Sequence, residues 1–137
     1  MILFSRWLDN SRRERPPLII LHGFLGSSDN WLSIARQLSH YLPVVLMDLR
    51  GHGNSSTSHY ISVRAMADDV VETAHHLGIK KCSIAGHSLG GKVSLALLSN
   101  NKMIIEKLIL IDVGIKNYPW LKTPFYNFIN FLINLQL

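Results

Sequence analysis

This sequence contains a single cysteine, no long apolar run and no histidine after residue 87. With Cys82 as the one cysteine among 137 residues, no intrachain disulfide can form and nothing requires an oxidising compartment. The apolar stretch at residues 1–4 is too short for a signal sequence and lacks a preceding basic segment. We therefore expect a cytoplasmic protein with Cys82 buried in its core.

A clustered basic surface is lacking as well. The net charge is +5, but the basic residues are scattered, except for a group that precedes the first core strand: Arg6, Arg12, Arg13 and Arg15. Nucleic-acid binding calls for a basic face with interleaved aromatic residues, and this segment has only Trp7. We predict no nucleic-acid partner. The 47% hydrophobic content is sufficient for the core of one domain.

Short apolar runs alternate with amphipathic stretches along the chain. Strands are expected at 18–21, 44–47, 82–85 and 108–113, with an outer strand within residues 1–8. Helices are expected between them. Strands that alternate with helices predict right-handed crossovers and a parallel sheet, which binds its ligands beyond the carboxyl ends of the strands.

Residue spacing sets the expected limits of the first two helices. Ser28 or Asp29 should cap the first. Its core side is expected to carry apolar residues at three- and four-residue spacing, namely Trp31, Ile34, Ala35 and Leu38. The second should run from a cap at Ser62 to a stop at Gly78.

Three glycine-rich motifs follow expected strands, at residues 22–27, 48–55 and 86–90. The last, Gly86-His87-Ser88-Leu89-Gly90, fits the G-x-S-x-G nucleophile elbow between a strand and a helix. A side chain at either glycine would collide with the backbone of so sharp a turn, which should hold Ser88 in a strained conformation. A helix that begins at Ser88 would direct its N–H groups toward a developing oxyanion. We expect the three motifs to meet in one cleft.

The elbow stretch also fits a second motif. Residues 86–92 satisfy G-x-x-x-x-G-K, the phosphate-binding P-loop, and residues 108–112 are similar to a Walker B strand. Val93, however, occupies the position of the Ser or Thr that would bind Mg²⁺, and valine cannot bind a metal ion. A P-loop nucleotide hydrolase is therefore the weaker alternative.

Taken in their order, the three motifs resemble the α/β-hydrolase superfamily over residues 18–113. The resemblance implies a three-layer α/β-hydrolase fold with a mainly parallel sheet whose C-terminal strands are missing. The Gly-Gly-Lys that ends the elbow is similar to small bacterial esterases and mitochondrial abhydrolase-domain esterases. The implied function is a serine hydrolase that cleaves small acyl esters or thioesters, without cofactor or metal.

The family pattern also implies roles for residues at the expected cleft. Ser88 would be the nucleophile that forms an acyl-enzyme, and the backbone N–H groups of Phe24 and Leu89 would form the oxyanion hole. Five residues would shape the surrounding loops: His22, Gly23, Gly86, His87 and Gly90. A second set would shape the neighbouring loop: Asp48, Arg50 and His52. A non-catalytic binding module on the same fold remains an alternative.

The resemblance fails at the rest of the triad. Its order in this fold is Ser, then Asp or Glu, then His, and all seven histidines of this chain precede Ser88. The base histidine is therefore absent. Asp112 is the candidate acid, although a strand-end aspartate could equally cap the loop backbone.

We interpret residues 1–113 as the N-terminal part of a hydrolase core and residues 114–137 as the start of a cap. The chain would then be an incomplete and inactive portion of a longer hydrolase. The helix expected at residues 125–137 is too short to span a membrane, and its apolar face is expected to cause self-association.

Overall fold

The computed structural model describes residues 1–11, 14–99 and 103–113. Its elements in chain order are β1 (Ser5–Leu8), β2 (Leu18–Leu21), η1 (Ser28–Trp31), α1 (Leu32–Leu38), β3 (Val44–Met47), α2 (Val63–His76), β4 (Lys81–His87), α3 (Leu89–Leu98) and β5 (Ile104–Ile111). The cap segment at 114–137, with its expected apolar helix, lies outside the described residues, so both stay predictions.

The five strands form one sheet in the order β1-β3-β2-β4-β5. Strands β2 to β5 run parallel, whereas β1 pairs antiparallel with β3. Every residue of β2 and β3 is buried, which agrees with their continuous apolar sequences. The mainly parallel sheet predicted from the sequence is confirmed.

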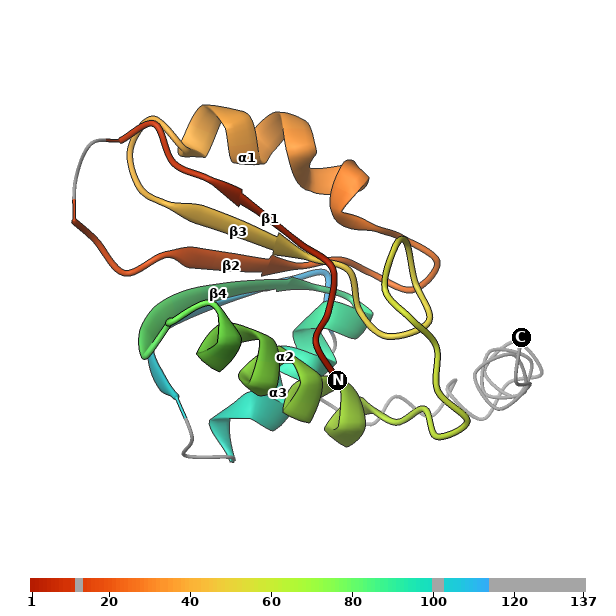
Figure 1. The fold of residues 1–137 in the computed structure, drawn as a ribbon. Helices are drawn as coiled ribbons and strands as arrows, with labels where there is room; N and C mark the ends of the chain where they lie inside the picture. Colours follow the sequence, from red (N-terminus) through yellow and green to blue (C-terminus); the bar gives the residue numbers. More distant parts are fainter. Residues whose placement is uncertain (12–13, 100–102, 114–137) are drawn as a thin grey trace.

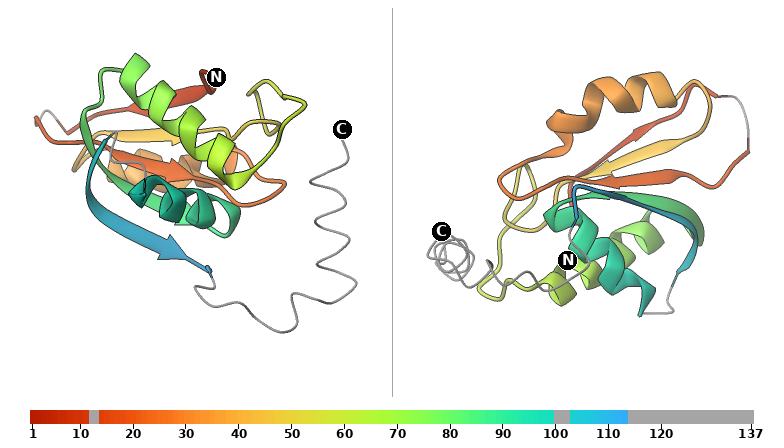
Figure 2. Two further views of the ribbon diagram at one scale, coloured as in Figure 1. Left: turned by 90° about the horizontal axis from the view of Figure 1, so that it is seen from below. Right: turned by 180° about the vertical axis from the view of Figure 1, so that it is seen from behind.

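Helices cover both faces of this sheet (Figure 1), which gives the three layers. Helix α1 lies on one face, and α2 and α3 lie side by side on the other (Figures 1 and 2). Side chains of β2 alternate between the two cores, because successive strand residues point to opposite faces. Ile19 and Leu21 join the larger core with α2 and α3, while Leu18 and Ile20 join the smaller core with α1.

The first helical segment differs from the sequence-based expectation. Its cap is Ser27, whose hydroxyl accepts from the Asp29 N–H (3.3 Å), while the Asn30 side chain accepts from the Ser27 N–H (2.8 Å). This capping box starts a 3₁₀ turn before α1 begins. Within α1 the residues at the smaller core are Leu32, Ala35 and Leu38, which are three apart, so Ile34 falls outside this stripe and is 46% exposed. Placing Ile34 on the core side was wrong.

Strand limits also differ at the end of the described chain. Strand β4 extends through His87, and β5 starts four residues earlier and ends two residues earlier than the expected 108–113. The charged pair Glu106 and Lys107 conceals the start of β5 in the sequence. A register shift beside Cys82 leaves Glu106 without a partner residue in β4, and its carboxylate pairs with Lys81 at 2.7 Å. Pairing with β4 therefore overrides the local polar sequence.

Candidate active site

Three non-glycine residues in the described part of the chain have a positive φ angle: Leu25 (59°), Ser88 (48°) and Asp112 (52°). They follow β2, β4 and β5, whose parallel carboxyl ends lie at one edge of the sheet. Such backbone conformations are costly for residues with side chains and concentrate at functional sites. The backbone thus marks the same edge as the glycine-rich motifs.

Ser88 alone connects β4 to α3, and it is the N-cap of that helix. The helix therefore begins at Leu89, one residue later than expected. A Cβ atom on Gly90 would lie 2.4 Å from the Leu21 carbonyl oxygen, and one on Gly86 would lie 2.5 Å from the Gly90 carbonyl oxygen. Both distances are too short for a real contact, so the predicted requirement for glycine at these positions holds.

Backbone hydrogen bonds fix the Ser88 turn from three directions. The Ser88 N–H donates to the Ile111 carbonyl of β5 (3.0 Å), and the Gly90 N–H donates to the His22 carbonyl (3.1 Å). The Gly91 N–H donates to the Ser88 carbonyl at 3.1 Å. Among the backbone bonds of the described residues, none uses the N–H of Leu89, which heads α3.

The same geometry excludes a P-loop. A phosphate-binding loop needs several residues between its strand and helix, so that successive N–H groups surround the phosphates. Here one residue separates β4 from α3, and Gly90, Gly91 and Lys92 lie inside the helix. The nucleotide-hydrolase alternative is wrong.

The loop after β2 packs directly against this elbow. A Cβ atom on Gly23 would lie 2.7 Å from His87 Nδ1 and 3.5 Å from the Ser88 Cβ. Glycine at this position therefore allows the loop to approach the elbow closely. The His87 ring also meets the Trp31 ring edge-on, with centroids 5.9 Å apart. His87 thus contacts both the loop after β2 and the 3₁₀ segment.

His22 joins the first two motifs. Its Nε2 accepts a hydrogen bond from the Leu49 N–H (2.9 Å), so its Nδ1 carries the proton and donates to the Gly23 carbonyl (2.7 Å). Burial lowers the pKa of His22, against the opposing effect of the Gly23 carbonyl, and favours this neutral tautomer. With both ring nitrogens engaged, His22 organises the loop and is not available as a base.

Asp48 is a fully buried carboxylate that holds two loops together. Its oxygens accept from the Ser28 N–H (2.6 Å) and from the Asn54 N–H (2.9 Å). Burial alone would raise the pKa of this carboxyl, but the two N–H donors outweigh it and lower the pKa below its ordinary value. A Cβ atom on Gly53 would lie 2.1 Å from Asp48 Oδ2, so glycine is required there.

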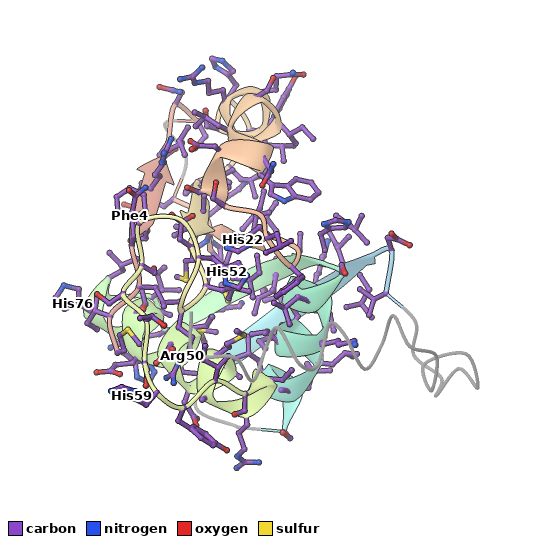
Figure 3. The ribbon with its side chains drawn as sticks, turned by 90° about the vertical axis from the view of Figure 1, so that its right-hand side faces the viewer. Phe4, His22, Arg50, His52, His59 and His76 are labelled. Atoms are coloured by element: carbon purple, nitrogen blue, oxygen red, sulfur yellow. The ribbon has the colours of Figure 1, made fainter. Side chains whose placement is uncertain are left out.

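His52, from the loop after β3, lies next to His22 (Figure 3). Its ring centroid is 5.2 Å from that of His22 and 5.8 Å from that of Phe24. Its Nδ1 lies 3.0 Å from the Arg50 carbonyl oxygen, to which it can donate. His52 therefore packs against Phe24 of the loop that faces the elbow. All three predicted motifs meet at this edge of the sheet.

Sequence reasoning missed one charged pair beside the site. Arg50 donates from Nε and Nη2 to the two carboxylate oxygens of Asp69, at 2.5 and 2.7 Å, and from Nη1 to the Tyr60 carbonyl at 2.6 Å. The bond to Asp69 raises the pKa of Arg50 despite partial burial. The available signal was the position of Asp69, three residues after Met66 on the apolar stripe of α2.

Asp112 follows the residue whose carbonyl accepts from the Ser88 N–H, so it lies beside the elbow. Its side chain is exposed. Across the described ranges, no hydrogen bond connects a histidine to the Ser88 hydroxyl. The same residues contain no cluster of three or more His, Cys, Asp or Glu that could hold a metal ion.

None of the helices in the described ranges combines the length and the apolar character that crossing a bilayer requires. The single cysteine, Cys82, is buried in β4 as expected. Burial raises its pKa to about 12, which keeps the thiol protonated and unreactive. Cys82 is therefore a core residue of the sheet.

The strand-turn-helix at Ser88, the loop after β2 and the mainly parallel sheet define an α/β hydrolase. Residues 16–134 match the family described as "alpha/beta hydrolase fold", and the chain belongs to this family. Among its relatives, Esterase YbfF of Escherichia coli is 34% identical over 108 residues, which are 79% of this chain and 42% of the relative. The sn-1-specific diacylglycerol lipase ABHD11 of Xenopus laevis is 36% identical over 101 residues, 72% of this chain and 32% of the relative.

A solved structure described as a marine microorganism esterase superposes with a TM-score of 0.82 at 34% identity. The match covers 96% of this chain and 49% of that chain. The chain thus spans about a third to a half of the length of the proteins that it matches. These relatives are named as an esterase and a lipase, and the solved structure is described as an esterase.

Proposed function

We propose that Ser88 is the nucleophile of a serine ester hydrolase. Its Oγ would attack the ester carbonyl carbon, the alcohol would leave with a proton, and water would then hydrolyse the acyl-enzyme. The observation that carries this proposal is the conformation of Ser88. Ser88 is partly exposed and has a φ angle of 48°. It lies between Gly86 and Gly90, where the surrounding backbone leaves no room for a side chain.

The backbone N–H groups of Leu89 and Phe24 would stabilise the oxyanion. Leu89 heads α3, where the helix dipole favours negative charge, and its N–H takes no part in the other backbone bonds of the turn. Phe24 follows Gly23, which the contact with the elbow brings close to Ser88. Losing one such donor typically costs roughly 3 kcal/mol of transition-state stabilisation.

Asp112 is our proposed acid, because its exposed side chain stands beside the elbow at the end of β5. The base is lacking in these 137 residues, since no histidine follows Ser88 in the sequence and His22 has both ring nitrogens engaged. Without its triad, a serine hydrolase retains only about 10³ to 10⁴ of its rate advantage over water. We expect this chain alone to turn over esters very slowly.

The proposed substrates are small acyl esters or thioesters, in keeping with relatives named as an esterase and a diacylglycerol lipase. The second candidate is a binding module on the same fold that performs no chemistry. The observation that favours it is that His22 has both ring nitrogens engaged in hydrogen bonds and holds the loops together without being available as a base. The two functions differ in whether Ser88 forms a covalent bond.

A fluorophosphonate probe tests this difference directly. The chain should acquire one adduct on Ser88, detected by intact mass and peptide mapping. Ser88→Ala should acquire none, whereas Ser56→Ala, on the exposed loop after β3, should be labelled like the wild type. A wild-type chain that is folded yet unlabelled after prolonged incubation would instead support the binding module.

A further inference from the structure

Leu25 is the most solvent-exposed of the large apolar side chains in the described part of the protein, at 79%. It also has one of the three positive φ angles at the carboxyl edge of the sheet, 59°. Neither property favours the folded protein, because the backbone conformation is strained for leucine and the side chain gains no burial.

The turn that contains Leu25 would accept a less costly residue. The Gly26 N–H donates to the Gly23 carbonyl (3.0 Å), which makes Leu25 the third residue of a four-residue turn. A positive φ at this position favours glycine or asparagine. Neither the turn nor the core therefore requires an apolar side chain at this position, whereas contact with an apolar ligand would.

The neighbouring Phe24 has the opposite orientation. It packs against the larger core, and its ring lies edge-on to His52 at 5.8 Å. Leu25 is therefore the apolar side chain of the turn that remains in solvent. Two residues before it, Gly23 lies so close to the elbow that a Cβ atom there would be 3.5 Å from the Ser88 Cβ. Leu25 thus belongs to the same four-residue turn as the glycine that contacts the elbow of the proposed nucleophile.

We propose that Leu25 is a specificity-determining residue that contacts the hydrocarbon chain of the ester substrate. This inference rests on the proposed ester chemistry at Ser88. A ligand with a long chain would cover the Leu25 side chain, whereas a ligand with two or three carbons would end before reaching it. The hydrogen bond from the Gly26 N–H to the Gly23 carbonyl closes the turn, which leads into the capped 3₁₀ segment, so Leu25 is held in position before a ligand binds.

The test compares alkyl fluorophosphonates with a two-carbon or a ten-carbon chain. The measured quantity is the ratio of the labelling rates of the two probes at Ser88. This ratio cancels the intrinsic reactivity of the serine. One probe pair carries the chain on the P–C bond, as an acyl mimic, and a second carries it on the P–O bond, as an alcohol mimic. The pair whose ratio falls when Leu25 is replaced identifies the part of the ester that Leu25 contacts.

Two substitutions remove the apolar side chain and suit the turn, Leu25→Gly and Leu25→Asn. We expect each to lower the ratio of long-chain to short-chain labelling by roughly three- to tenfold, with the short-probe rate and the melting temperature at least maintained. Tyr41→Ser is the matched control. Tyr41 is 66% exposed but precedes β3, at the opposite edge of the sheet, and its loss should leave the ratio unchanged.

A ratio that is unchanged in both Leu25 variants would overturn the inference while leaving the ester chemistry intact. A second measurement detects binding at Leu25 even if Ser88 does not react. The methyl NMR signals of Leu25 should shift on addition of unreactive decylphosphonate, and not with ethylphosphonate. Such shifts without any Ser88 labelling would support the Leu25 contact and refute the chemistry. If these shifts are missing and Ser88 is unlabelled, both proposals are wrong.

Discussion

His22 illustrates how one side chain fixes the site at the scale of a residue. It is 1% exposed and uses both ring nitrogens, one toward Leu49 of the loop after β3 and one toward Gly23 of the loop after β2. A neutral imidazole can do this because one nitrogen accepts while the other donates. Protonation would leave the Leu49 N–H facing a second donor.

The stability of the protein should therefore fall at acidic pH, where the unfolded chain binds a proton at His22 and the folded protein does not. Its pKa is lowered in the folded state, so its contribution is complete above the unfolded value of about 6.5 and is lost as the pH falls toward the folded value. We expect a loss of up to about 1.4 kcal/mol per pH unit in this window. Urea unfolding at pH 7.5, 6.5 and 5.5 measures it.

His22→Gln keeps one donor and one acceptor without a titrating group, so its stability should change less over the same pH range. The exposed His40→Gln should retain the wild-type profile. Equal pH dependence in the wild type and in His22→Gln would show that another group carries the effect.

At the scale of the elements, the contact between α3 and β2 determines whether the elbow can form. The N-terminus of α3 approaches β2 so closely that the Gly90 N–H reaches the His22 carbonyl at 3.1 Å. A Cβ atom on Gly90 would meet the Leu21 and His22 carbonyl oxygens at 2.4 and 2.6 Å, and neither backbone group can move independently. A larger residue would have to push the helix away from the sheet.

Gly90→Ala should accordingly destabilise the fold by about 3 kcal/mol, the upper range for overpacking, and should abolish probe labelling of Ser88. Gly78→Ala is the matched control. Gly78 has φ of 75°, and a Cβ atom there would meet no other atom within 4 Å, so alanine introduces backbone strain only. It should cost about 1 kcal/mol and leave labelling intact. Thermal unfolding and intact mass measure the two effects.

At the scale of the whole molecule, Asp48 connects segments from three parts of the sequence. Its carboxylate binds the Ser28 and Asn54 N–H groups, and its own backbone N–H donates to the Phe4 carbonyl (3.0 Å). The first two bonds require the ionised form, which can accept at both oxygens. The loops at this end of the molecule are therefore held together by the negative charge of Asp48, which has no cationic partner among these contacts.

Asp48→Asn should destabilise the protein at neutral pH by about 1 to 3 kcal/mol, because an amide NH₂ would face one of the two N–H donors. The lowered pKa of Asp48 gives the sign of the pH effect. Its contribution is present above the unfolded value of about 3.9 and disappears as the pH falls through the folded value. The wild type should lose stability in this acidic range, and the variant should lose less.

Asp29→Asn provides the control, because Asp29 is 67% exposed and pairs with Arg6 at 2.7 Å on the surface. Exposed pairs contribute little, so its unfolding curve should follow that of the wild type. Acid unfolding followed by circular dichroism distinguishes the variants. An Asp48→Asn curve that coincides with the wild type would refute this role for Asp48.

The sequence by itself determined the order of the elements and the position of the elbow. The periods of strands and helices depend on residues that are close together in the sequence. The same holds for the glycines around Ser88 and for the cap at Ser62, so all of these features could be predicted from the sequence. The parallel sheet followed from the alternation of strands and helices. The roles of Ser88, Asp112 and the cap segment stay predictions.

Only the tertiary structure decided which distant residues meet. It joined Arg50 to Asp69 and Leu49 to the ring of His22, placed the start of β5 among charged residues, and left Leu25 in solvent. These outcomes depend on contacts between segments that the chain brings together by folding, and those contacts override local preference. Periodicity and motifs cannot predict these long-range contacts, because each describes a residue only by its neighbours in the sequence.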